Sequence, residues 1–236
     1  MAALLLVAAR SASEIPALDS ARQLVIVTAA NWKSVRGIGQ RFERASRNTA
    51  WRMVGKPFAI TLGHHGMAWG RGLHPEPLAD AGPRKAEGDK CAPAGIFKLG
   101  AAFGEEARVA TALAYVHIDG GSSCIEETAS RYYNRMIQIG EVEPRDFTSV
   151  DPLLHRETYR AGIFVEHNVA PALPGAGSCI LLHIWRSPRT GTAGCTAMAR
   201  AKLDALIGWL DRAKHPLLVQ LPVREYARRR RAWRLP

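Results

Sequence analysis

Cysteine is scarce in this sequence, and the spacings typical of zinc ligands are missing. The four cysteines lie far apart and form no CxxC pair: Cys91, Cys124, Cys179 and Cys195. A structural zinc site needs closely spaced Cys and His ligands, so these spacings argue against one. The nearby histidines His64, His65 and His74 do not match a ligand pattern either, and we expect no metal.

Long apolar runs are also missing. No segment approaches the roughly 18 apolar residues of a membrane-spanning helix. A short apolar stretch, Ala2–Ala9, precedes the small and polar residues Ser11–Ser13 and resembles a secretory signal, although no Lys or Arg stands before it. We expect residues 1–22 to be an export signal, or otherwise an N-terminal structured segment. An export signal would make the protein periplasmic or otherwise extracytoplasmic. In that oxidising setting Cys124–Cys179 is the disulfide to test, with buried free thiols as the alternative.

Acidic residues are too few to balance the basic ones. The chain has 32 Lys and Arg against 21 Asp and Glu, which gives a net charge of +11. Much of the excess lies in residues 224–236, with Arg224, Arg228, Arg229, Arg230, Arg231 and Arg234. We expect a solvated, frayed basic tail. The alternative is contact with a polyanion, for which an anionic membrane or wall polymer is favoured over nucleic acid because no nucleic-acid motif accompanies the run.

The 236 residues show no repeat and no break in composition, so we expect one domain over residues 23–223. Apolar, β-branched runs predict strands at 23–28, 51–54, 58–62, 94–99, 161–167, 179–185 and 217–221. Residues 55–57 should form a turn and residues 74–94 a long loop, whereas 126–155 cannot be assigned. From Cys195 onward the apolar period changes, which predicts one amphipathic helix over 196–213. The fold class is therefore mainly β with a few helices.

The segment from His183 to Cys195 has the composition of a catalytic site. An apolar run ends at His183, and a loop rich in Gly, Pro and Thr then leads to Ala193-Gly194-Cys195. If a helix starts at Cys195, its positive end lowers the thiol pKa from about 8.5 and its free N–H groups, with Gly194, can bind an oxyanion. His183 can then act as the base.

These residues resemble the signature of the L,D-transpeptidase catalytic domain, in which a strand-borne His is followed by Ser/Thr-x-Gly-Cys. A second stretch, Glu87–Leu99, is similar to the Gly-Asp…Pro-x-Gly-x-Phe segment of that family, and Val54–Gly72 and His167-Asn168 look like one of its branches. The resemblance spans about residues 23 to 222. It implies a β-sandwich or barrel-like catalytic domain with an amphipathic helix after the nucleophile.

The resemblance implies an enzyme without cofactor that cross-links or remodels peptidoglycan stem peptides through a thioester at Cys195. Water in place of the amine would make it an L,D-carboxypeptidase, and a third interpretation is a basic polyanion-binding protein in which Cys195 is structural. Two departures concern substrate recognition. Ala193 stands where many members have His, and Thr196-Ala-Met198 lacks the Arg that often follows the Cys. We therefore expect the substrate to be bound by Arg186, Arg189, Thr192, His167 and Asn168.

Overall fold

The computed structural model describes residues 15–76, 82–148, 150 and 152–236. Most of the expected signal segment, residues 1–14, lies outside this part. Residues 15–22 belong to the folded domain rather than to a separate segment. They include the short helix α1 (Pro16–Ser20), and the side chains of Ile15 and Leu18 are buried in the main hydrophobic core.

The domain is built around a closed eight-stranded β-barrel. Around the barrel the order is β12 (Leu217–Pro222), β1 (Gln23–Ala29), β2 (Arg36–Glu43), β3 (Arg52–Thr61), β11 (Thr196–Met198), β10 (Leu181–Ile184), β9 (Ala161–Val165) and β5 (Ala92–Gly104). The ring closes because β12 pairs with both β1 and β5. The mainly β fold class is confirmed, and a barrel is the form it takes.

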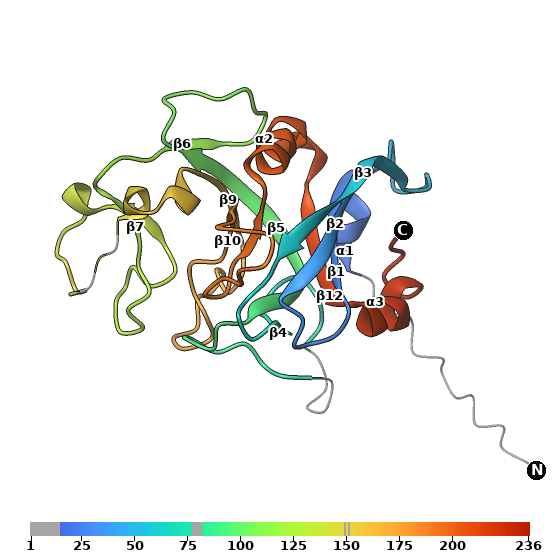
Figure 1. Ribbon diagram of the computed structural model, residues 1–236, viewed down its shortest axis with the longest axis horizontal. Helices are drawn as coiled ribbons and strands as arrows, with labels where there is room; N and C mark the ends of the chain where they lie inside the picture. Colours follow the sequence, from blue (N-terminus) through green and yellow to red (C-terminus); the bar gives the residue numbers. More distant parts are fainter. Residues whose placement is uncertain (1–14, 77–81, 149, 151) are drawn as a thin grey trace, which may run out of the picture.

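The remaining elements surround the barrel (Figure 1). Strands β4 (Met67–Trp69) and β6 (Tyr115–His117) extend β5, while β7 (Ser122–Cys124) and β8 (Met136–Gln138) form a separate two-stranded sheet. Two longer helices are α2 (Arg200–Trp209) and α3 (Val223–Arg230). Short 3₁₀ turns are η1 (Ile139–Glu141), η2 (Leu153–His155), η3 (Glu157–Tyr159) and η4 (Arg212–Lys214).

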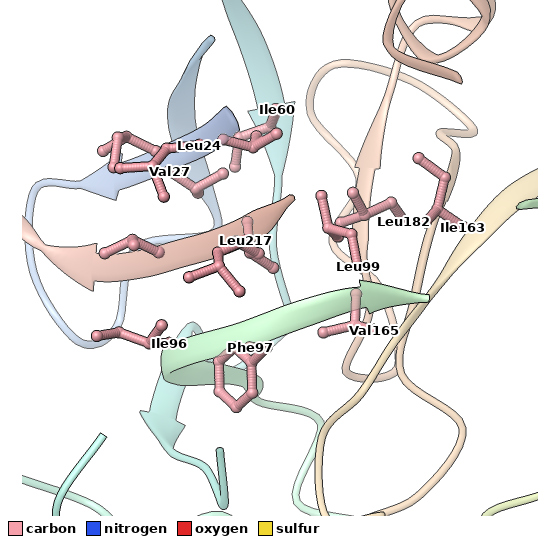
Figure 2. Packing of buried hydrophobic residues seen from close by; sticks show 14 of the residues in the cluster. Leu24, Val27, Ile60, Ile96, Phe97, Leu99, Ile163, Val165, Leu182 and Leu217 are labelled. Atoms are coloured by element: carbon pink, nitrogen blue, oxygen red, sulfur yellow. The ribbon is translucent and has the colours of Figure 1, made fainter. Parts of the chain in front are cut away.

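The barrel interior is the main hydrophobic core. Side chains from strands far apart in sequence meet there, and Figure 2 shows Leu24, Ile60 and Leu182 pointing into the same interior. All three are almost completely buried. Burying such a side chain stabilises the fold by about 1.5–3 kcal/mol. The expected strands at 23–28 and 217–221 are confirmed as β1 and β12, which pair in parallel.

Two expectations about local structure are wrong. The stretch predicted as strand, turn and strand is one strand, β3. Gly39 of β2 pairs with Phe58 and Arg41 pairs with Val54, so residues 55–57 form a bulge within β3 and not a turn between two strands. The helix predicted over 196–213 begins only at Arg200. Before it, Thr196 and Met198 point into the barrel interior, so the chain first completes strand β11 between β10 and β3.

The C-terminal segment is not a frayed tail. Helix α3 follows β12 directly, and after it Trp233 and Leu235 are both only 7% exposed and belong to the main core. Arg229 lies over the rings of Trp69 and Trp233 and pairs with the buried Glu225. The basic residues of this segment are therefore carried on a packed part of the domain.

Candidate active site

Strands β10 and β11 place His183 and Cys195 on the same face of the barrel wall. The strands run parallel, with Leu182 opposite Thr196 and His183 opposite Ala197, and Cys195 directly precedes β11. Strand side chains alternate between faces. Leu182 points into the main core, whereas Leu181 and Cys195 share a smaller outer cluster. His183 is two residues after Leu181, so it shares this outer face.

The thiol of Cys195 is buried and held by backbone groups. Its Sγ accepts a hydrogen bond from the N–H of Leu181 at 3.4 Å and donates one to the carbonyl oxygen of Cys179 at 3.5 Å. The residue is 6% exposed. Its proton is therefore directed at a carbonyl oxygen and not at the imidazole.

Burial raises the pKa of the Cys195 thiol to about 12. The negative charge of Glu126 adds to this effect, whereas the N–H of Leu181 and the charge of Lys85 oppose it. The expected lowering by a helix start is wrong, because β11 separates Cys195 from α2. In this arrangement Cys195 is a neutral thiol.

His183 has one nitrogen engaged and one free. Its Nδ1 lies 2.8 Å from the carbonyl oxygen of Ile184. A carbonyl only accepts, so Nδ1 carries the proton and Nε2 carries the lone pair. Nε2 is buried and makes no hydrogen bond within the described part of the chain. Nε2 is therefore available to accept a proton from a group that reaches it.

The imidazole of His183 is neutral as well. Burial lowers its pKa to about 4, and the charge of Arg186 acts in the same direction, while the backbone groups of Ile184 and Thr158 oppose it. The ring of Tyr159 meets it edge to face, with 4.9 Å between ring centroids. His183 is thus a neutral base of fixed orientation.

A cap covers this face, formed by the described residues between Ile118 and Tyr159; Figure 1 shows it at the end of the molecule that carries β7. Ile118 and Leu153 pack on Cys195 and Leu181 in the outer cluster. A disulfide joins Cys124 of the cap to Cys179, as predicted. The cap is therefore tied to the residue whose carbonyl oxygen binds the Cys195 thiol.

Two adjacent cavities lie along this face, separated by residues that line both of them: Arg156, Tyr159 and Ala193. The first, of about 400 Å³, also touches Leu181 and the disulfide. The second, of about 280 Å³, is lined by His183 and Arg186. Cys195 lines neither cavity, so other residues separate its thiol from both.

The loop before Cys195 is held by Thr192. The hydroxyl of Thr192 donates to the carbonyl oxygen of Cys195 at 2.6 Å and accepts from the N–H of Gly194 at 3.1 Å. Gly194 has φ 153°, a value that side chains rarely adopt. The Thr192 hydroxyl and the Gly194 N–H therefore both stabilise the turn. The Gly194 N–H, which we expected to bind an oxyanion, already donates to Thr192.

The remaining predicted substrate-binding residues are in three different settings. Arg186 lines the cavity beside His183, whereas exposed Arg189 lines neither cavity. His167 and Asn168 are buried and bonded within the protein. His167 accepts from the Arg71 N–H, and Asn168 binds backbone groups of Leu173 and Gly177. Their contacts organise the 168–177 loop.

The second stretch of the resemblance, Glu87–Leu99, meets the Cys195 loop in space. A Cβ on Gly194 would lie 3.3 Å from the carbonyl oxygen of Cys91 and 3.9 Å from Nζ of Lys85. Lys85 is itself buried and pairs with Asp89 at 2.6 Å. This places a buried positive charge near the thiol. Sequence analysis missed Lys85 and the cap residues Arg156 and Tyr159, because nothing in their local pattern shows which face they reach.

Two of the three histidines considered as metal ligands have other partners. His65 Nδ1 lies 2.8 Å from the carbonyl oxygen of Asp89, and His74 accepts from the N–H of Ile96. Among the described residues there is no group of three or more His, Cys, Asp or Glu side chains placed to hold a metal ion. Nor does the described chain contain a helix long and apolar enough to cross a membrane.

Comparison with known proteins adds no relative: no family model matches the sequence, and no match was found among curated proteins or solved structures.

Proposed function

We propose that this protein is a cysteine acyltransferase of the L,D-transpeptidase type, acting on peptidoglycan stem peptides through a thioester at Cys195. The observation that carries the proposal is the buried, unbonded Nε2 of His183 on the same outer face as Cys195. With its lone pair unengaged, Nε2 is available to take a proton from a thiol that reaches it. The two adjacent cavities on this face, one of them lined by His183, supply room for a peptide.

In the first step the Cys195 proton moves to Nε2 of His183 while Sγ attacks the carbonyl carbon of the donor peptide. The resulting tetrahedral adduct collapses, the bond to the D-amino acid breaks, and His183 returns the proton to the departing amine. A thioester remains on Cys195. For this step the thiol must turn from the Cys179 carbonyl oxygen toward the imidazole.

In the second step an amine of another stem peptide attacks the thioester carbonyl and gives its proton to His183. The thiolate leaves, takes the proton back, and a new amide bond remains. If water attacks instead, the products are a shortened peptide and a free thiol, which is carboxypeptidase chemistry. The outcome depends on which acceptor reaches the thioester first.

The resting form is closed, so the cap must shift before a peptide reaches Sγ. Three features describe the closed form: Cys195 is 6% exposed, it lines neither cavity, and its thiol is neutral. Rehydration of Sγ when the cap opens would lower the thiol pKa toward its ordinary value. The charge of Lys85 favours the thiolate, and the charge of Glu126 opposes it. We expect Lys85 to dominate once the opening cap moves Glu126 away from Sγ.

The proposal is tested by mass spectrometry of the products formed from a stem tetrapeptide, with and without an amine acceptor. We expect release of the terminal D-amino acid and a thioester adduct on Cys195. Cys195→Ala should abolish both, whereas the matched variant Cys91→Ala should retain them. His183→Gln should lower the rate by at least about 100-fold, and exposed His117→Gln should not. A Cys195→Ala protein that retains the activity would refute the proposal.

A further inference from the structure

The end of the barrel away from the cap carries a second feature, which the proposed acyl transfer does not use. Six arginines lie on α3, directly after it, or directly after β2, and Asp19 contacts members of both groups. We call them the basic surface: Arg44, Arg47, Arg224, Arg230, Arg231 and Arg234. Figure 1 shows α3 and the C-terminus at the end of the molecule opposite β7 and the cap. The basic surface and the covered Cys195 face therefore point in different directions.

The basic surface is rigidly mounted. Arg229 beneath it lies 4.7 Å from the ring centroid of Trp69 and 5.6 Å from that of Trp233, and it pairs with Glu225, which is 4% exposed. Trp51 donates from Nε1 to the carbonyl oxygen of Arg234 at 3.2 Å. The C-terminal arginines are thus held against the β2–β3 region and do not lie on a free tail.

Positive charge on this surface is poorly compensated. Asp19 is shared between Arg47 at 3.6 Å and Arg234 at 4.0 Å. Within the described chain no carboxylate pairs with Arg224, Arg230 or Arg231. Like charges held together in this way repel each other, so the surface favours an anionic partner.

Arg44 shows the crowding of positive charge directly. Burial, and then the charges of Arg22, Arg234 and Arg47, lower the pKa of its guanidinium, and only Asp19 acts in the opposite direction. The same guanidinium lies 4.2 Å from the ring centroid of Trp51 and donates to the carbonyl oxygen of Leu18. These contacts hold the Arg44 guanidinium in place although the neighbouring arginines repel its positive charge.

The kind of anion follows from the side chains. Guanidinium groups bind phosphate oxygens in pairs of hydrogen bonds. Single-stranded nucleic acid would also require exposed rings for base stacking. Here Trp51 is covered by Arg44, and Trp233 is 7% exposed. The surface offers charge without stacking platforms, which fits a layer of phosphate groups better than a strand of bases.

Helix α1 adjoins this surface through Asp19 and Leu18. Arg and Lys side chains clustered on one surface are attracted to the negative surface of membranes that contain anionic lipids. We propose that the basic surface docks on anionic phospholipid headgroups. Docked in this way, the molecule directs its cap and Cys195 away from the lipid.

The test is co-sedimentation of the full chain with vesicles of phosphatidylcholine containing about one-third phosphatidylglycerol. We expect binding in about 0.1 M salt that is lost in about 1 M salt, where the Debye length falls to about 3 Å. The triple variant Arg224→Gln, Arg230→Gln, Arg231→Gln should bind about 100-fold more weakly, since each basic residue near the lipid contributes about fivefold. Pure phosphatidylcholine vesicles should bind neither protein.

A matched control removes the same charge elsewhere: Arg108→Gln, Arg135→Gln, Arg145→Gln. These exposed residues lie on the β5–β6 loop and the cap, and we expect this variant to bind vesicles like wild type. Equal loss in both triple variants would overturn the proposal, because binding would then depend on net charge alone. Binding to polyphosphate or duplex DNA without binding to the vesicles would overturn it too. Cys195→Ala should bind normally, so failure of the acyl-transfer proposal does not affect this result.

Discussion

The thiol of Cys195 donates a hydrogen bond to the carbonyl oxygen of Cys179, 3.5 Å from Sγ, and Cys179 is joined by a disulfide to Cys124 of the cap. Cys179 therefore contacts the proposed nucleophile through its backbone and anchors the cap through its side chain. This arrangement stores Cys195 as a neutral, shielded thiol. It also makes the state of the cap the main control on its reactivity.

Alkylation by iodoacetamide should report this shielding. In the resting protein we expect Cys91, which is partly exposed, to react before the buried Cys195. Burial raises the pKa of Cys195 to about 12, so its thiolate fraction and its reaction rate should rise about tenfold per pH unit across the alkaline range. Mass mapping of each cysteine against pH measures both. Rapid modification of Cys195 at neutral pH, ahead of Cys91, would contradict the closed arrangement.

The Cys124–Cys179 disulfide should contribute both to stability and to closure of the cap. It closes a loop with a sequence separation of 55. The double variant Cys124→Ser, Cys179→Ser should lower the free energy of unfolding by about 2–4 kcal/mol. The same variant should alkylate faster at Cys195, because the cap is no longer tied to Cys179.

Urea unfolding and cysteine mapping measure these two effects separately. Cys91→Ser serves as the control, since it removes a sulfur atom that forms no disulfide. If the double variant loses stability but keeps Cys195 as protected as in wild type, the packing of Ile118 and Leu153 holds the cap closed without the disulfide.

The strands that could be predicted from the sequence are those whose own residues form a continuous apolar run. Strands β1 and β12 are short runs of apolar residues, and every position of β12 is buried. Strand β2 was missed because its first residues are mostly exposed and include two glycines. The start of α2 was misplaced because Met198 fits both the helical period and the inward face of β11.

The candidate site was predicted in part for the same reason. Cys195 and His183 stand out by residue type and setting, and the structure places them on one outer face. The cap could not be predicted, because residues 126–155 have no periodicity and their path depends on a disulfide and on packing against distant strands. The pKa of Cys195 was predicted in the wrong direction, since burial by the cap outweighs any local field.

Buried histidines should make the protein less stable in acid. Burial lowers the pKa of His74, His167 and His183 to about 4 each. In the unfolded chain they titrate near 6.5, so between about pH 6.5 and 4 the unfolded state binds more protons. Stability should therefore fall as the pH drops through this window, by about 1.4 kcal/mol per pH unit for each histidine.

Urea unfolding of His183→Gln at several pH values isolates one of these contributions. We expect its stability to depend less steeply on pH than that of wild type, because one proton fewer is taken up on unfolding. An unchanged slope in His183→Gln would mean that His183 titrates alike in the folded and unfolded protein, so that burial does not hold its imidazole neutral below about pH 6.5.

Tyr159 should act as a positioning residue for His183. Its ring meets the imidazole at 76° with centroids 4.9 Å apart, and it lines both cavities. Loss of the ring lets the imidazole tilt, and small displacements of a base reduce the rate of proton transfer. We expect Tyr159→Leu to lower kcat for stem-peptide turnover by about tenfold with little change in KM, while Tyr159→Phe keeps the ring contact and stays near wild type.

A matched substitution in the same cap separates positioning from general loosening. Tyr132 and Phe147 form a similar edge-to-face pair, 5.8 Å apart and at 87°, and neither residue lines the two cavities. Tyr132→Leu should therefore disturb the cap without lowering kcat as Tyr159→Leu does. Equal losses in the two leucine variants would assign the effect to the cap as a whole, and a loss in Tyr159→Phe would assign it to the hydroxyl. Only a loss specific to Tyr159→Leu, rescued by phenylalanine, identifies the ring as the part that orients His183.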